Sequence, residues 1–343
     1  MKNKISRRSF LSGSAAALAT ASIAPIATSC QSTPPAPSFP GIYDFGSKFN
    51  GVQIGVITYS WRNMPGGLEN IIKYCKETGI NSVELMSNDL EMFLGAPVNP
   101  LRGMPRQPAG TPPPPGSPTP EEQAAIREKY AADVNAFRLG VTPEKVAAAK
   151  KLFDDAGIAI HTVKFSPSRW TSDEEIDYAF ITAKAMGAKA VSDEIGENAV
   201  KKLAPFAEKH GMYINLHNHK QFAEEGFSVD PLLAVSPTVM MNFDVGHYYG
   251  STGLNPCDIM RKYHDRIYSI HLKDLTGPTT EPDPDNYQIF GQGETPLDEV
   301  LLLVKKEGWP YSMDIEMEYP VKPWSTQVKE VRNCVQYARN ILL

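Results

Sequence analysis

Four short segments in the second half of the chain alternate between apolar and polar residues. They are YINLHNH at 213–219, VMMNFDVGH at 239–247, IYSIHLKD at 267–274 and YSMDIEMEY at 311–319. Successive side chains of a β-strand point to opposite faces, so each segment presents one apolar face and one face that carries His, Asp or Glu. The pattern predicts four strands whose polar faces converge on one site.

Helical segments separate these strands, and the same alternation extends toward the N-terminus. Four earlier segments have the composition of strands: VQIGVITYSW at 52–61, SVELMS at 82–87, IAIHTVKF at 158–165 and AKAVSDE at 188–194. Eight strands, each followed by a helix or a connection that contains one, over roughly 250 residues are typical of a (β/α)8 TIM barrel, whose active site lies at the carboxyl ends of its strands. A doubly wound open sheet is the alternative, but no Gly-rich phosphate loop follows the first strand.

One long insertion interrupts the alternation after the second strand. Residues 91–140 contain the proline-rich stretch PVNPLRGMPRQPAGTPPPPGSPTP, followed by the helical segment EEQAAIREKYAADVNAFRLG. Proline cannot donate a backbone hydrogen bond, so this stretch cannot form a barrel element and is expected to run over the surface. It is interpreted as a lid over the site, a solvated loop or an oligomer contact.

The first thirty residues are predicted to be a targeting signal. A basic start with Arg7 and Arg8 precedes a run rich in Ser and Ala, and this arrangement resembles a bacterial twin-arginine export signal. Cys30 is either a lipid acceptor or an incidental residue beside an ordinary cleavage site. Residues 31–50 are predicted to form a tether, and residues 51–343 the barrel. We expect an exported bacterial protein, either periplasmic or anchored to the membrane as a lipoprotein.

The charge balance restricts the partners. The formal net charge is −5, and four of the basic residues lie in the first thirty positions, which contain no acid. The rest of the chain is therefore more acidic still, whereas nucleic-acid binding relies on Lys and Arg that neutralise phosphates. We expect no nucleic-acid partner, and a membrane contact only through a lipid on Cys30.

The polar faces of the last four strands provide a possible metal site. His217, Asp244, His271 and Glu316 would lie near the mouth of the barrel. Burying such groups without partners costs several kcal/mol each, and one divalent metal ion would satisfy two imidazoles and two carboxylates together. Mixed nitrogen and oxygen ligands suit manganese, cobalt, zinc or iron. A hydrogen-bonded network of His and Asp without metal is the alternative.

Five further residues are candidates for contact with a substrate or for proton transfer. His219 and His247 are expected to touch substrate oxygens, and Lys273 to hold an oxyanion. Glu194, at the end of the fourth strand, is interpreted as a base, a ligand or a helix cap. Trp61 is expected either to form an apolar wall of the substrate site or to pack in the core.

These motifs resemble a known family. NFDVGH, SIHLKD, FGQGETPLDEVL and DIEME resemble, in this order, the closing motifs of the xylose-isomerase-like sugar phosphate isomerase/epimerase family, and the resemblance covers most of the chain from Gly51 onward. It implies a TIM barrel with one divalent metal ion at the carboxyl ends of the strands. It also implies that Asp244, His271 and Glu316 are metal ligands and that His247 binds substrate.

The fifth strand departs from one branch of this family. Tagatose-epimerase-like members place a glutamate where this chain has His217. The LHNH sequence resembles another branch, which has related YHNH sequences. In that case His217 remains a metal ligand, and His219 or Glu194 takes the acid/base role.

The expected reaction is metal-assisted proton abstraction next to a sugar carbonyl, through an enediolate. Glu316 or Glu194 would remove the proton, and His247 or His219 would orient hydroxyl groups or donate a proton. Return of the proton gives an isomerase or epimerase, whereas expulsion of a β-substituent gives a lyase or dehydratase. An exported protein would act on a neutral keto sugar or 3-keto-glycoside.

Three other functions are alternatives. A non-catalytic lipoprotein that binds sugar would use the same pocket. A metal-dependent apurinic endonuclease would be expected to carry more His ligands on early strands and a basic DNA face. A metallohydrolase such as an amidohydrolase would carry an early HxH pair, but the HxH of this chain lies at 217–219, on the fifth strand.

Overall fold

The computed structural model describes residues 45–102 and 116–343. The expected export signal at 1–30, Cys30 and residues 31–44 of the expected tether lie outside the described residues. The folded unit begins before residue 51, because β1 (Lys48–Phe49) pairs antiparallel with β2 (Val52–Ile57). Ser47 is fully buried, and its hydroxyl donates to the Ile54 carbonyl. The last residues assigned to the tether are therefore part of the folded unit.

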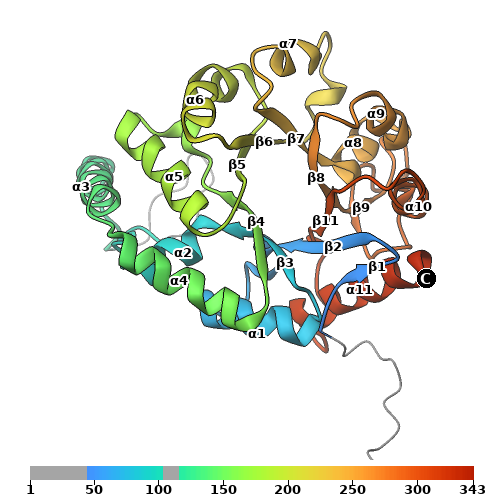
Figure 1. Cartoon of the computed structure of the whole chain (residues 1–343), viewed down its shortest axis with the longest axis horizontal. Helices are drawn as coiled ribbons and strands as arrows, with labels where there is room; N and C mark the ends of the chain where they lie inside the picture. Colours follow the sequence, from blue (N-terminus) through green and yellow to red (C-terminus); the bar gives the residue numbers. More distant parts are fainter. Residues whose placement is uncertain (1–44, 103–115) are drawn as a thin grey trace, which may run out of the picture. The chain divides into compact units, whose positions relative to one another are not determined.

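Eight parallel strands form a closed barrel, which confirms the predicted TIM-barrel fold. The last strand pairs with the first, and the first also pairs with the second, so the sheet closes. Figure 1 shows these strands inside a ring of helices. The barrel strands are β2, β3 (Ser82–Met86), β4 (Ala159–Lys164), β5 (Ala190–Glu194), β6 (Tyr213–His217), β7 (Val239–Asp244), β8 (Ile267–Leu272) and β11 (Ser312–Ile315).

Helices and short connections join the strands in the alternating order that the sequence predicts. The α-helices are α1 (Leu68–Thr78), α2 (Ser87–Leu94), α3 (Pro120–Leu139), α4 (Pro143–Ala156), α5 (Asp173–Ala185), α6 (Glu197–His210), α7 (Asp230–Leu233), α8 (Val245–Thr252), α9 (Pro256–Lys262), α10 (Leu297–Glu307) and α11 (Gln327–Leu342). The 3-10 turns are η1 (Thr58–Trp61), η2 (Pro167–Arg169) and η3 (Gln221–Ala223), and β9 (Asp274–Leu275) pairs with β10 (Tyr287–Gln288). Within the described ranges, no helix is long and apolar enough to span a bilayer.

The alternation within each strand separates an apolar layer from a polar one. In β6, Ile214 and Leu216 belong to the hydrophobic core, whereas Asn215 hydrogen-bonds to Ser269 of β8. The Asp314 side chain of β11 likewise lies in the polar layer, next to Gly55 of β2. An added Cβ at Gly55 would lie 2.0 Å from an oxygen of Asp314. TIM barrels usually fill the interior with branched apolar side chains. Here, much of the interior is polar, which leaves charged groups next to the site.

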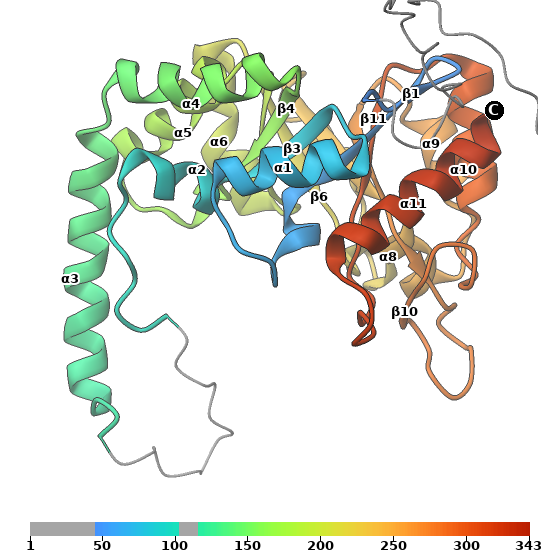
Figure 2. The same cartoon turned by 90° about the horizontal axis from the view of Figure 1, so that it is seen from below.

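The insertion after β3 contains the predicted helix, α3. Its N-terminus has a capping box, in which Thr119 accepts from the backbone of Glu122 and the Glu122 carboxylate accepts from the backbone of Thr119. No residue of α3 is buried, and Figure 2 shows the helix extending away from the barrel. At its C-terminal end, Arg138 forms ion pairs with Glu91 and Glu175, each at 2.9 Å. The helix is therefore attached mainly through its last turn.

Candidate metal centre

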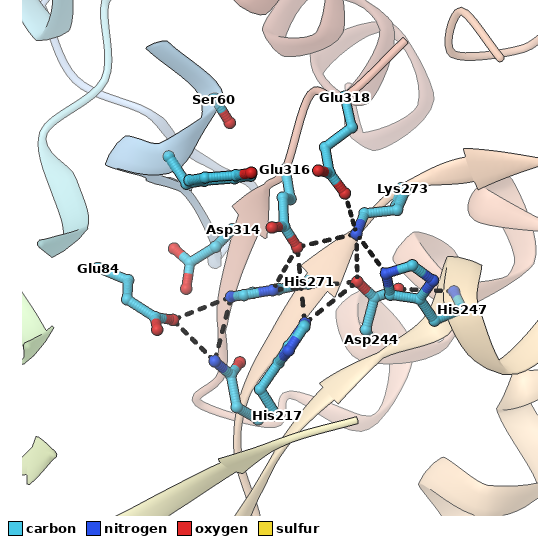
Figure 3. A network of polar contacts seen from close by, with 12 residues as sticks. Ser60, Glu84, His217, Asp244, His247, His271, Lys273, Asp314, Glu316 and Glu318 are labelled. Atoms are coloured by element: carbon cyan, nitrogen blue, oxygen red, sulfur yellow. Dashed lines mark hydrogen bonds and ion pairs between the residues drawn. The ribbon is translucent and has the colours of Figure 1, made fainter. Parts of the chain in front are cut away.

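The ends of four neighbouring strands bring together the residues that the sequence singled out as metal ligands. His217 ends β6, Asp244 ends β7, His271 lies one residue before the end of β8, and Glu316 directly follows β11. All four side chains are buried, and their ligand atoms lie within 4.8 Å of one another. Figure 3 shows the side chains pointing toward one another. The barrel thus gathers the four residues at one point.

The donor atoms suit a divalent ion of intermediate hardness. His217 Nε2 lies 3.4 Å from Asp244 Oδ2 and 3.6 Å from Glu316 Oε2. His271 Nδ1 lies 2.9 Å from Glu316 Oε2 and 4.0 Å from Asp244 Oδ2. Two imidazole nitrogens and two carboxylates therefore face a common point, a ligand set that fits zinc, manganese, cobalt or iron.

Each of the two imidazoles also has a carboxylate on its other ring nitrogen. Glu194 Oε2 lies 3.5 Å from His217 Nδ1, and Glu84 Oε2 lies 2.9 Å from His271 Nε2. Metal-binding histidines commonly have such a partner, which fixes the ring and its tautomer. The outer contacts therefore fit a metal centre as well as the inner ones do.

The carboxylates around the two imidazoles favour the protonated form of each ring. Burial alone would lower the pKa of His217, but its contacts with Asp244, Glu194 and Glu316 outweigh burial and raise the pKa to about 9. Burial is outweighed in the same way at His271, whose pKa is held well above its usual value by Glu316 and Glu84. A metal ion would have to replace these protons.

Lys273, which follows β8, lies inside the carboxylate cluster. Its Nζ is 3.1 Å from Asp244, 3.0 Å from Glu316 and 2.8 Å from Glu318. Burial opposes the ammonium form, but these carboxylates outweigh it and hold the pKa of Lys273 well above its usual range. Lys273 is therefore a buried cation that compensates the charge of the carboxylates.

His247 is neutral and has a free donor. The side chain of Asp244 accepts from the backbone N–H of His247 and caps the start of α8. Burial, with a further contribution from the charge of Lys273, lowers the pKa of His247 to about 3. Since the Lys273 ammonium can only donate, His247 Nε2 accepts from it at 2.8 Å and Nδ1 carries the hydrogen. This Nδ1 is buried and has no partner among the described residues.

Glu194 and His219 form the more exposed edge of the site. Glu194 ends β5, and its carboxylate lies 2.7 Å from Lys164 Nζ and 3.0 Å from His219 Nε2. Burial opposes ionisation, but contacts with His217 and His219 outweigh it and hold the pKa of Glu194 well below its usual range. The helix-cap interpretation of Glu194 is wrong, because the nearby α6 begins after Gly196 without a side-chain cap.

Trp61 lies at the end of η1, where it is 2 % exposed and packs 5.5 Å from the Tyr74 ring. It lines a hollow of about 630 Å³ near the ends of β2 and β3, together with Met64, Met86 and Tyr130. The four candidate metal ligands are not among the residues that line this hollow. Trp61 is therefore a buried core residue that lines this hollow and does not line a pocket shared with the candidate metal ligands.

Two residues that contact the site were not among the candidates named from the sequence. Glu84 contacts His271 from β3, and Glu318 contacts Lys273. The signal for Glu84 was present, because it is the single acid in the apolar strand SVELM. Glu318 follows Glu316 on the same parity, but Glu316 is the one that joins the candidate ligands.

The sequence and the fold identify the class of protein. The family model described as xylose isomerase-like TIM barrel matches residues 124–337, and the chain belongs to this family. An inosose dehydratase of Clostridium botulinum (strain Alaska E43 / Type E3) is 39% identical over 84 residues, which are 23% of this chain and 27% of that protein. The chain therefore matches only about a quarter of the length of this relative.

Solved structures share the fold. A sugar phosphate isomerase/epimerase from Parabacteroides distasonis ATCC 8503 superposes with a TM-score of 0.53 at 16% identity, over 89% of this chain and 100% of that one. The IolI protein, solved with a bound zinc atom, superposes with a TM-score of 0.53 at 14% identity, over 85% and 98%. At these identities the likeness concerns the fold.

Proposed function

We propose that this protein is a divalent-metal-dependent enzyme that removes a proton next to the carbonyl of a keto sugar or keto-glycoside. The observation that carries the proposal is the buried group of His217, Asp244, His271 and Glu316, whose ligand atoms lie within 4.8 Å of one another. These residues would hold one metal ion, which would supply Lewis-acid stabilisation of negative charge on a substrate oxygen. The IolI protein, which shares the fold, was solved with a bound zinc atom, and this supports a divalent metal ion in the present chain.

Glu194 and His219 are the pair that we assign to proton transfer. Glu316 faces His271 and Lys273 inside the ligand group, whereas the His219 side chain is 49% exposed and can reach a substrate. If His219 Nε2 donates to Glu194 across the 3.0 Å contact, then Nδ1 is free to accept a proton. The Glu194 carboxylate then stabilises the imidazolium that forms.

The neutral His247 is assigned to a substrate oxygen. Its Nδ1–H is buried and has no partner among the described residues, so a carbonyl or hydroxyl oxygen placed there would satisfy it. Lys273, which donates to the other nitrogen of the ring, keeps the Nδ1–H tautomer in place. The pair would hold negative charge as it develops on the substrate.

The fate of the enediolate defines the reaction. Return of the proton to the substrate gives isomerisation or epimerisation, which is the first candidate. Elimination of a β-substituent is the second candidate, and it is supported by the partial match to an inosose dehydratase. Because residues 1–30 are expected to be an export signal, we further propose that the protein acts outside the cytoplasm on an uncharged substrate.

Deuterium exchange tests the shared first step. The purified protein would be analysed for bound metal and then incubated in deuterated water with keto sugars and 3-keto-glycosides. We expect deuterium at the carbon next to the carbonyl, with products that identify isomerisation, epimerisation or elimination. Asp244→Ala and His271→Ala should lose both metal and turnover, whereas Asp258→Asn, an exposed partner of Arg261 on α9, should retain both. Binding of sugar without exchange, or full activity in a metal-free variant, would overturn the proposal.

A further inference from the structure

A directed chain of hydrogen bonds crosses the polar interior of the barrel and ends on His271. Asn215 Nδ2 donates to Ser269 Oγ at 2.7 Å, and Ser269 Oγ donates to Asn242 Oδ1 at 2.7 Å. Asn242 Nδ2 then donates to Glu84 Oε2 at 2.8 Å. His271 Nε2 lies 2.9 Å from the same Glu84 oxygen. All five side chains are 0% exposed.

The order of donors and acceptors favours one tautomer of His271 at the end of the chain. Ser269 gives its only hydrogen to Asn242, so the amide of Asn242 must present its nitrogen to Glu84. A carboxylate oxygen accepts, and Glu84 Oε2 already accepts from Asn242 Nδ2. Asn242 Nδ2 also lies 3.1 Å from His271 Nε2, but the closer neighbour of Nε2 is the Glu84 oxygen at 2.9 Å, so Nε2 carries a hydrogen toward Glu84. The nitrogen that faces Glu316 at 2.9 Å is Nδ1.

We propose that Glu84 is a positioning residue, which sets His271 as a metal ligand through Nδ1. The inference rests on the metal centre of the proposed function. An imidazole can bind a metal through either nitrogen, and the hydrogen bond made by the other nitrogen decides which one is available. Glu84 thus does not bind the metal itself. It accepts a hydrogen bond from His271 Nε2 and leaves Nδ1 available to the metal.

Packing does not account for Glu84. Its Oε1 is buried and has no partner among the described residues, which is costly for a carboxylate. An apolar side chain at this position of β3 would avoid that cost, as replacements of buried ion pairs often do. The contact with His271 supplies a reason for a charge at this position.

A second metal ion bound by Glu84 is the competing interpretation. Glu84, His271 and Asp314 also present ligand atoms within 4.8 Å of one another. However, Asp314 lies 3.0 Å from His161 Nε2, and Glu84 lies 2.9 Å from His271 Nε2. Each carboxylate already has an imidazole nitrogen within hydrogen-bonding distance. We therefore assign the group to hydrogen bonding.

Zinc affinity and nitrogen NMR test the role of Glu84. The variants are Glu84→Met, which removes the acceptor, and Glu84→Gln, which keeps one acceptor oxygen. Zinc dissociation constants would be measured against a chelator, and the 15N shifts of His271 would identify the coordinating nitrogen. Glu175→Gln, a buried partner of Arg138 on α5, is the control for loss of a buried carboxylate.

We expect Nδ1 coordination in the wild type. Glu84→Met should weaken zinc binding by roughly 10- to 100-fold, Glu84→Gln should weaken it less, and Glu175→Gln should not change it. Nε2 coordination in the wild type, two zinc ions per chain, or unchanged affinity in folded Glu84→Met would overturn the inference. If Glu84→Met does not fold, the wild-type spectrum and Glu84→Gln decide. Absence of zinc binding by the wild type would instead overturn the proposed function itself.

Discussion

Lys273 Nζ lies 3.0 Å from Glu316 Oε2, so an ammonium group occupies the carboxylate cluster that we propose as a metal site. It also lies 3.1 Å from Asp244 Oδ2. The ammonium reduces the repulsion between the two buried carboxylates, but it would repel a divalent ion bound to the same oxygens. Lys273 should therefore stabilise the metal-free protein and weaken its affinity for metal.

Lys273→Met tests this balance. Removing one partner of a buried ion pair costs about 3–5 kcal/mol, so the metal-free variant should unfold at lower urea than the wild type. Zinc should bind the variant more tightly and restore more stability to it than to the wild type. Urea unfolding with and without zinc measures both effects. Lys202→Met, whose Nζ donates to the Ser168 carbonyl away from the cluster, is the control. Weaker zinc binding by Lys273→Met would mean that Lys273 is needed to hold the ligands in place.

Glu194→Gln and Glu316→Gln separate proton transfer from metal binding. Glu194→Gln should still bind the metal, with an affinity weakened only as expected for an outer partner of His217, but should lose activity by roughly 10²- to 10⁴-fold at saturating metal, because the carboxylate behind His219 is neutralised. Glu316→Gln should lose metal and activity together. Metal content and initial rates measure the difference. Glu194, His217 and His219 also form a close group, so complete loss of metal from Glu194→Gln, as in Glu316→Gln, would place Glu194 among the ligands instead.

The sequence predicted the four candidate ligands for a simple geometric reason. Strand periodicity determines which side chains share a face, and a barrel brings the ends of its strands together. The alternation within each of four strands was therefore enough to place four polar residues on the converging faces, namely His217, Asp244, His271 and Glu316.

The role of Glu84 depends on pairings that no local pattern reveals. Its partner His271 is 187 residues away, and the two meet only because the barrel closes. Strand parity does not say whether an acid faces solvent or the interior of a barrel. The protonation of His247 and Lys273 likewise depends on burial and on carboxylates from other strands.

Asp274, the last residue of the motif SIHLKD, joins this motif to FGQGET. Its Oδ2 accepts from the backbone of Gly291 at 2.8 Å and of Gly293 at 3.1 Å. At Gly293 an added Cβ would lie 2.2 Å from Asp274 Oδ1, so this close approach requires glycine. Burial outweighs these hydrogen bonds and raises the pKa of Asp274 from 3.8 to about 6.

Asp274→Asn should change the pH dependence of stability. Because the folded state raises this pKa, the contribution of Asp274 is fully present below about pH 4 and is lost as pH rises through about 6. The loss amounts to at most about 3 kcal/mol. Asparagine keeps an acceptor for the two glycine amides but does not titrate, so the variant should gain stability relative to the wild type as pH rises. Urea unfolding at several pH values measures this, and a constant difference across the range would contradict the assigned pKa.

Arg138 decides how firmly the insertion is held to the barrel. Its guanidinium pairs with Glu91 and Glu175 and lies 3.6 Å from the centroid of the Trp170 ring, whereas no residue of α3 is buried. Arg138→Ala should therefore speed amide exchange along 120–139 without changing exchange in the barrel strands. Arg138→Lys, which keeps the charge but loses the two-pronged contact, should give an intermediate result. If the insertion is a lid, Arg138→Ala should also raise KM. An unchanged KM with faster exchange would favour the solvated-loop interpretation, and unchanged exchange would mean that contacts other than Arg138 hold the helix.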